Sequence, residues 1–165
     1  MIFRTERLLI TKLILKDLDD FYKLESDPEV LKFATGTIKN LEESRIDLNA
    51  IVSKYNIKDN NFWIYAVKRK SDATFLGTVA LVKDGMEDEI GYRFLKKYWG
   101  NGYGLEICKG LISYCKQIGK TKLIAYVVDE NKASAKILER LNFKKVKHFM
   151  SEDIQLPETK YEIIL

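Results

Sequence analysis

Apolar residues recur along the chain with two different spacings, and the change from one spacing to the other separates predicted strands from predicted helices. Alternating or β-branched stretches predict strands at residues 8–13, 62–69, 75–82, 89–95, 122–128, 143–150 and 159–164. A polar turn at 70–74 and Asp84-Gly85 separate three of these strands. We therefore expect residues 62–95 to form an antiparallel meander.

Helical spacing is clearest in the segment that starts at residue 105, where Gly119 stands at the position of a left-handed C-terminal residue. The apolar positions of this helix are Leu105, Cys108, Leu111, Ile112, Cys115 and Ile118. Further helices are predicted after Asp17, after Asn40 with Glu43 in a capping box, and after Asn131. The order of elements predicts a single α/β (α+β) domain over residues 1–165, with a mixed, mostly antiparallel sheet of about six to seven strands flanked by helices.

Composition and charge exclude several classes of protein. The chain is 46% hydrophobic and 32% charged with two prolines, as expected of one globular domain. Its net charge of +4 is spread along the sequence, so nucleic-acid binding is not indicated. The N-terminal residues lack a signal-peptide core, and no apolar run approaches the roughly 20 residues of a membrane span. We expect a cytoplasmic protein, either a monomer or a homodimer.

The two cysteines are predicted to be free. Cys108 and Cys115 are seven residues apart in the predicted helix, which separates their Cα atoms by about 10 Å, too far for a disulfide. The single histidine, His148, is predicted to lie on the surface of a strand, and one histidine with two core cysteines makes no zinc site. We expect no metal cofactor.

A glycine-rich loop at Tyr98–Gly104 lies between a predicted strand and the clearest helix. Successive backbone N–H groups and a helix N-terminus can converge there on a phosphate, although the glycines of a tight turn would give the same pattern. A dinucleotide fingerprint requires glycine where Leu105 stands. Gly119–Thr121 matches the end of a P-loop, but Tyr114 occupies the place of its first glycine.

Several segments together resemble the cofactor-binding core of the GNAT superfamily of N-acetyltransferases. They are the strand Glu89–Leu95, the loop Tyr98–Glu106 and the segment Asn131–Phe143, while Thr5–Leu9 resembles the opening of the ribosomal-protein N-terminal (RimJ/RimL-like) acetyltransferase branch. The resemblance implies a sheet splayed at a coenzyme A site. It also implies transfer of an acetyl group from acetyl-CoA to a primary amine, such as a protein N-terminus, a polyamine, an amino sugar or another small amine.

Three positions depart from the superfamily pattern. Trp99 replaces the usual Gln or Arg at the head of the loop, and Asn142 replaces a Gly. These changes are tolerable, because backbone amides bind the pyrophosphate and Asn accepts left-handed geometry. Leu138 replaces a frequent Tyr and so removes a commonly proposed general acid.

The resemblance implies a set of cofactor-binding residues that act mainly through the backbone. Pantetheine is expected to pair with the backbone of Phe94 and Leu95, like an added strand. The pyrophosphate is expected to meet the amides of Gly100, Asn101, Gly102, Tyr103, Gly104 and Leu105. Asn131 is expected to reach the pantetheine arm.

The resemblance also suggests catalytic residues. Glu89 is expected to act as the base, directly or through water, because the attacking amine must lose a proton. Ser134 is the candidate acid for the departing thiolate, and the amide of Leu95 is a candidate donor to the oxyanion. By residue type alone, Glu89 would be a solvated strand residue and Ser134 a helix-start hydrogen-bonding residue.

The acceptor pocket and the class of activity leave alternatives open. Phe33, Trp63 and Tyr126 could line an acceptor pocket, but aromatic residues on strands and helices belong to the core more often. A non-catalytic acyl-CoA-binding sensor would keep the cradle while lacking the chemistry. A module that binds RNA or the ribosome has only the modest positive charge in its favour.

Overall fold

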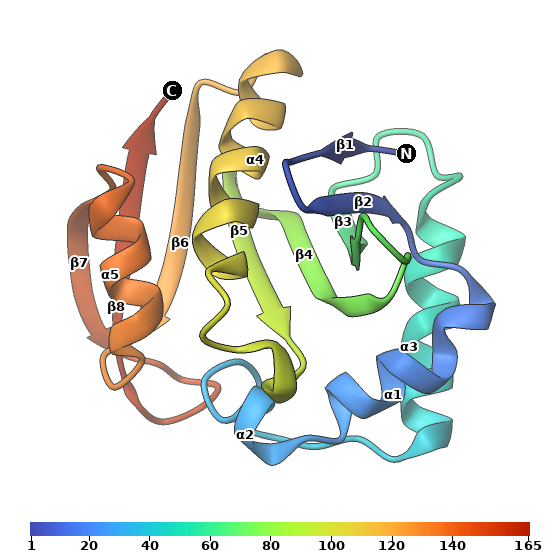
Figure 1. Cartoon of the computed structure of the whole chain (residues 1–165). Coiled ribbons are helices and arrows are strands. Elements are labelled where there is room, and N and C mark those ends of the chain that lie inside the picture. Colours follow the sequence, from blue (N-terminus) through green and yellow to red (C-terminus); the bar gives the residue numbers. More distant parts are fainter.

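The computed structural model describes all residues 1–165 and contains one eight-stranded sheet with helices on both faces (Figure 1). The strands lie in the order β1-β2-β3-β4-β5-β6-β8-β7. Their bounds are β1 (Phe3–Arg4), β2 (Leu8–Lys12), β3 (Phe62–Arg69), β4 (Phe75–Asp84), β5 (Glu87–Phe94), β6 (Lys122–Val128), β7 (Lys144–Met150) and β8 (Pro157–Ile164). The α/β fold and the meander of β3, β4 and β5 are confirmed. The strand not predicted is β1, which at two residues is too short to give a pattern.

In three of the five helices a polar side chain accepts a hydrogen bond from the first turn, and the other two begin without a side-chain cap. They are α1 (Leu18–Glu25), α2 (Pro28–Leu31), α3 (Leu41–Lys54), α4 (Tyr103–Gln117) and α5 (Lys132–Arg140), with short 3-10 turns at Leu15–Asp17 and Lys96–Tyr98. Asn40 and Glu43 form the predicted capping box of α3, and Asn131 caps α5. The Asp27-Pro28 pair lies just beyond the end of α1 and starts α2, with Asp27 as its N-cap. None of the helices has the length and apolar character needed to cross a membrane.

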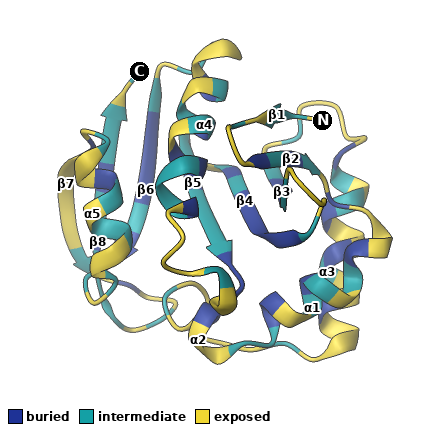
Figure 2. Ribbon diagram, viewed as in Figure 1, coloured by how far each residue is buried: buried dark blue, intermediate teal, exposed yellow.

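The two faces of the sheet carry different helices. Successive side chains of a strand point to opposite faces, so Tyr92 contacts α5 while Arg93 contacts α1. Figure 2 shows that buried residues line the sheet and the inner sides of the helices. Cys108 and Cys115 are free and buried in this core, as predicted.

The sheet opens between β5 and β6. These two strands run parallel, and their register contains one pair, Glu89 opposite Ile124. Every other neighbouring pair of strands is antiparallel. Because the strands separate beyond this pair, the backbone of the C-terminal half of β5 has no partner strand on its β6 side.

Candidate functional site

A cleft of about 280 Å³ occupies the opening between β5 and β6. It is lined on one side of the sheet by Glu89, Tyr126 and Glu158, and on the other by Tyr92 and Ser134. The cleft therefore passes through the sheet and connects its two faces. Apolar and aromatic walls with a few convergent polar groups are typical of small-molecule sites.

The glycine-rich loop leads into α4 and presents an unbroken row of free backbone donors. None of the six N–H groups from Gly100 through Leu105 donates a hydrogen bond within the protein, and the N-cap Gly102 provides no side-chain cap. Glu106 is the first residue whose N–H is used, by the carbonyl of Gly102 at 3.2 Å. Free N–H groups at the positive end of a helix dipole form a site for an anion.

Each glycine of the loop has its own structural reason. Gly100 and Gly102 have φ angles of +76° and +78°, which residues with a side chain rarely adopt. Gly104 is required for packing, because a Cβ there would lie 2.9 Å from Cδ1 of Ile137 and 3.2 Å from Oη of Tyr92. The third glycine thus lets α4 approach α5 and β5 closely.

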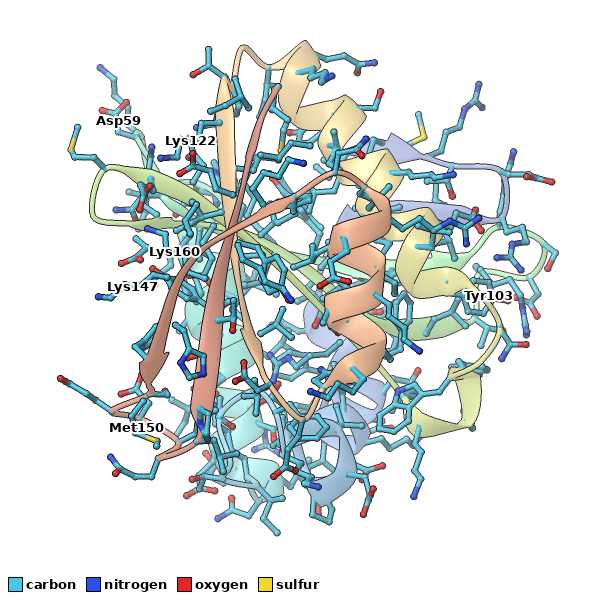
Figure 3. All side chains as sticks on the ribbon, turned by 90° about the vertical axis from the view of Figure 1, so that its left-hand side faces the viewer. Asp59, Tyr103, Lys122, Lys147, Met150 and Lys160 are labelled. Atoms are coloured by element: carbon cyan, nitrogen blue, oxygen red, sulfur yellow. The ribbon has the colours of Figure 1, made fainter.

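The loop is joined to β5 by aromatic residues. The rings of Tyr103 and Phe94 are 6.0 Å apart, and the indole N–H of Trp99 donates to the Phe94 carbonyl at 2.8 Å. Figure 3 shows Tyr103 at the start of α4, on the opposite side of the molecule from Lys147 and Lys160 of the last two strands. These contacts fix the loop beside the end of β5.

The backbone of β5 separates the roles expected of Phe94 and Leu95. The N–H of Leu95 donates to the carbonyl of Leu76 at 2.9 Å, so it is already used within the sheet. In an antiparallel ladder the next residue directs its N–H and carbonyl to the opposite edge, which places those of Phe94 and Tyr92 toward the opening. The N–H of Phe94 is thus available for strand-like pairing, while its carbonyl already accepts from Trp99. The Leu95 N–H is not free to meet an oxyanion.

Glu89 lies in the cleft at the one point where β5 and β6 pair. Burial, together with the nearby carboxylates of Asp84 and Glu158, raises the pKa of its carboxyl to about 7. Glu158, which also faces the cleft, has a pKa raised mainly by burial. No ion pair of the chain includes Glu89 or Glu158, whereas Glu87 on the same strand pairs with Lys122 and Lys160.

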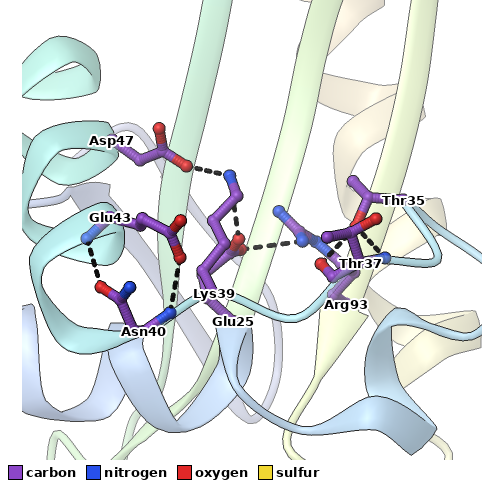
Figure 4. A network of polar contacts seen from close by, with 8 residues as sticks. All are labelled: Glu25, Thr35, Thr37, Lys39, Asn40, Glu43, Asp47 and Arg93. Carbon is purple, nitrogen blue, oxygen red and sulfur yellow. Dashed lines mark hydrogen bonds and ion pairs between the residues drawn. The ribbon is translucent and has the colours of Figure 1, made fainter.

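The single arginine of the cleft does not compensate these carboxylates. Arg93 Nη1 lies 2.8 Å from Oε1 of the buried Glu25, which is also 3.5 Å from Lys39 (Figure 4). Lys39 in turn pairs with Asp47 of α3. Because Glu25 of α1 neutralises Arg93, this arginine does not offset the negative charge of Glu89 and Glu158 in the cleft.

On the other face, Ser134 belongs to a short hydrogen-bonded chain. Its Oγ lies 3.2 Å from Oη of Tyr92, and its N–H donates to Oδ1 of Asn131 at 3.2 Å. Asn131 lines the cleft while capping α5, and Leu138 fills the adjacent wall. Sequence reasoning missed the role of Tyr92, because its partner Ser134 is 42 residues away in the chain and no local pattern links the two.

Other residues considered from the sequence lie inside or outside this site as follows. Phe33 and Tyr126 line the cleft. Trp63 lies elsewhere, in a separate hollow of about 470 Å³ that is distant from the glycine-rich loop. His148 is an exposed β7 residue, as predicted, and contacts Asp129 at 2.7 Å. No group of three or more metal-binding side chains comes together.

Comparisons with known proteins agree with this geometry. A family model described as an acetyltransferase (GNAT) domain matches residues 7–144. The uncharacterized N-acetyltransferase YoaA of Bacillus subtilis is 24% identical over 149 residues, which cover 87% of this chain and 83% of YoaA.

Solved structures show the same fold. A GNAT-family acetyltransferase from Bacillus anthracis matches with a TM-score of 0.86 and 23% identity, over 98% of this chain and 97% of that one. The ribosomal L7/L12 α-N-protein acetyltransferase RimL, in complex with coenzyme A, matches with a TM-score of 0.83 and 12% identity, over 98% and 96% of the two chains. The family model spans the chain from the turn before β2 to the start of β7. This protein therefore belongs to the GNAT family of acetyltransferases.

Proposed function

We propose that this acyltransferase is an acetyl-CoA-dependent N-acetyltransferase that acetylates a primary amine by direct attack on the thioester. The observation that carries the proposal is the row of six unpaired N–H groups from Gly100 through Leu105, beside a through-sheet cleft that contains Glu89. A diphosphate fits such a row, because each N–H can donate to a phosphate oxygen without displacing an internal partner. The thioester end of the same molecule would then reach the cleft.

The residues present fit coenzyme A from its pyrophosphate to its thioester end. Gly100 to Leu105 would hold the pyrophosphate, the free N–H of Phe94 would pair with the pantetheine arm, and the side-chain amide of Asn131 faces the cleft. Bound acetyl-CoA supplies an activated acetyl carbonyl and a thiolate leaving group. All other steps belong to side chains of the protein.

Glu89 is the proposed base. A pKa of about 7 makes it a carboxylate for half of the molecules at neutral pH, and its basicity is close to that of an α-amino group, near 8. It can therefore take the proton of an incoming ammonium with little free-energy cost. An ordinary surface glutamate, with a pKa near 4.5, would be a much weaker base.

Ser134 is the proposed donor to the departing thiolate, and Tyr92 is the residue that orients it. Burial raises the pKa of Tyr92, so its phenol stays protonated and can donate to the Ser134 hydroxyl. That hydroxyl can then donate in turn toward the cleft. The pair supplies the function that Leu138 cannot provide at the position where related proteins often have a tyrosine.

The charge of the cleft bears on the acceptor. Two carboxyl groups without cationic partners, Glu89 and Glu158, favour an acceptor that carries positive charge in addition to the reacting amine. Polyamines and basic protein N-termini meet this requirement, and an amino sugar does so only through the reacting nitrogen. The segment Thr5–Leu9 supports the ribosomal-protein N-terminal branch within this set.

The test combines binding with turnover. Acetyl-CoA should raise the melting temperature, and a panel of diamines, amino sugars and N-terminal peptides should release free thiol from it. Glu89→Gln should lower kcat by about 100-fold while leaving the Kd for CoA unchanged. The matched control is Glu87→Gln, on the same strand and face but paired with Lys122 and Lys160.

Each outcome decides between the candidates. Absence of any CoA-dependent stabilisation would overturn the proposal at its first step. Binding of acetyl-CoA without turnover of any amine would favour the non-catalytic sensor. Equal activity of Glu89→Gln and Glu87→Gln would remove Glu89 from the role of base.

A further inference from the structure

The N-terminal hairpin contacts the outer side of the glycine-rich loop. Thr5 and Arg7 lie in the turn between β1 and β2, and this turn is fixed to the sheet because the Arg7 carbonyl accepts the N–H of Lys70 at 2.8 Å. The hairpin also packs along α4, where a Cβ on Gly110 would lie 2.5 Å from Cγ2 of Thr5. The turn thus forms a rigid base next to the loop.

Arg7 reaches from this base to three parts of the loop. Its Nη1 donates to the carbonyl of Asn101 at 3.0 Å, and its Nε lies 2.7 Å from Oε2 of Glu106. Its guanidinium lies over the ring of Tyr103, 4.6 Å from the centroid. One planar guanidinium therefore holds a loop carbonyl, a loop aromatic ring and the first turn of α4 at the same time.

The Asn101 carbonyl is the backbone group whose direction matters most. Asn101 lies between Gly100 and Gly102, both with positive φ, where the absence of side chains permits many backbone conformations. The free N–H groups can converge on one anion only if the Asn101 carbonyl, which lies among them in the chain, points away from that anion. By accepting from Arg7, this carbonyl is held on the side away from the row.

The negative charge of Glu106 would oppose the binding of a pyrophosphate, and Arg7 neutralises this charge. Glu106 lies in the first turn of α4, close to the N–H groups that would hold a pyrophosphate, where a bare carboxylate would repel it. Its carboxylate accepts from the Thr5 hydroxyl at 2.5 Å, the Arg7 N–H at 2.7 Å and the Arg7 Nε at 2.7 Å. Although burial raises the pKa of Glu106, these hydrogen bonds outweigh that effect and lower it.

We propose that Arg7 is a positioning residue for coenzyme A, acting through the Asn101 carbonyl and the Glu106 carboxylate without touching the acetyl group. This inference rests on the proposed use of the loop as the pyrophosphate site. It assigns a physical role to the Thr5–Leu9 segment. Arg7 keeps the loop in its anion-binding conformation and neutralises the acid nearest to the anion.

The experiment compares two thioesters, of which only acetyl-CoA contains the pyrophosphate and the adenosine 3′-phosphate attached to it. The other, S-acetylpantetheine, presents the same thioester and pantetheine arm without these groups. Arg7→Gln should raise the KM for acetyl-CoA by about tenfold, as expected when hydrogen bonds to a charged group are lost, and should change kcat by less than about twofold. With S-acetylpantetheine its kcat/KM should equal that of the unmodified protein.

Matched variants separate positioning from a general effect of charge. Arg4→Gln removes the same charge from the same hairpin, at an exposed residue with no ion pair, and should leave the KM unchanged. Arg7→Lys keeps a cation near Glu106 but loses the planar fork, so its KM should fall between those of the other two proteins. Adding Glu106→Gln to Arg7→Gln should lower the KM again, because the uncompensated carboxylate is removed.

The outcomes are distinguishable. An equal loss with both thioesters, or equal effects of Arg7→Gln and Arg4→Gln, overturns the role of Arg7 while leaving the proposed function in place. Failure of the unmodified protein to bind CoA by calorimetry overturns both. Calorimetry with CoA and pantetheine gives the same comparison without turnover, and melting curves of each variant show that it is folded.

Discussion

Glu89→Gln should make the protein more stable at the same time as it makes it less active. The Glu89 carboxyl has a pKa of about 7 in the folded protein against an ordinary value of 4.5, because burial and the carboxylates of Asp84 and Glu158 disfavour its charged form. A pKa that is higher in the folded state stabilises the fold below pH 4.5. This contribution is lost progressively as the pH rises to about 7.

The size of the effect follows from linkage. A pKa difference of roughly 2.5 units corresponds to a cost of about 3 kcal/mol in the free energy of unfolding at pH 8, falling to about 2 kcal/mol at pH 6 and about 1 kcal/mol at pH 5. Glutamine has nearly the same shape and carries no charge, so Glu89→Gln should recover this cost. For a chain of this length, about 3 kcal/mol is roughly 6–12 °C in melting temperature.

The assay is urea unfolding followed by circular dichroism at pH 5, 6, 7 and 8, with Glu87→Gln as the control. The pKa of Glu87 is lowered by hydrogen bonds from Lys122 and Lys160, so its removal should destabilise the protein at pH 8. The two variants lie two residues apart on β5 and should change stability in opposite directions. A stability gain for Glu89→Gln that is absent at pH 8, or that does not grow with pH, would refute the reasoning.

Three further predictions concern activity. The kcat/KM for amine acetylation should rise with pH through a midpoint near 7, and Glu158→Gln should move that midpoint to lower pH, which pH-rate profiles of both proteins would show. Tyr92→Phe should reduce kcat by a larger factor than it changes the KM for acetyl-CoA, because Ser134 loses its hydrogen-bonding partner. Steady-state kinetics that show no change in kcat would remove Tyr92 from the proton path. Gly104→Val should raise the KM for acetyl-CoA and destabilise the fold by about 1–3 kcal/mol, since its side chain would displace Tyr92 and Ile137; a normal melting curve would contradict the packing described.

The elements that could be predicted from the sequence are those specified by local chemistry. Helical spacing and Gly119 indicated α4, while Asn40 with Glu43 and Asn131 marked the starts of α3 and α5. The glycine-rich loop was also evident, because positive φ angles and a helix start require particular residues in a short stretch. Local signals of this kind do not depend on which distant segments pack together.

The roles expected of Phe94 and Leu95 show where local information ends. Both residues lie at the end of β5, but the N–H of one faces β4 and the N–H of the other faces the opening. This choice depends on the register of β4 against β5, which is set by contacts along both strands. The sequence shows that Phe94 and Leu95 are neighbours, but it does not show which of the two N–H groups faces the opening.

What the sequence by itself determined is the family of folds and the loop expected to bind an anion, because these rest on residues that are close together in the chain. Only the tertiary structure decided the chemistry around that loop. It opened the sheet between β5 and β6, placed Glu158 near Glu89, Tyr92 beside Ser134 and Arg7 against Glu106. Burial and the charges of distant neighbours set a pKa, and both are properties of the packed chain that residue type alone does not contain.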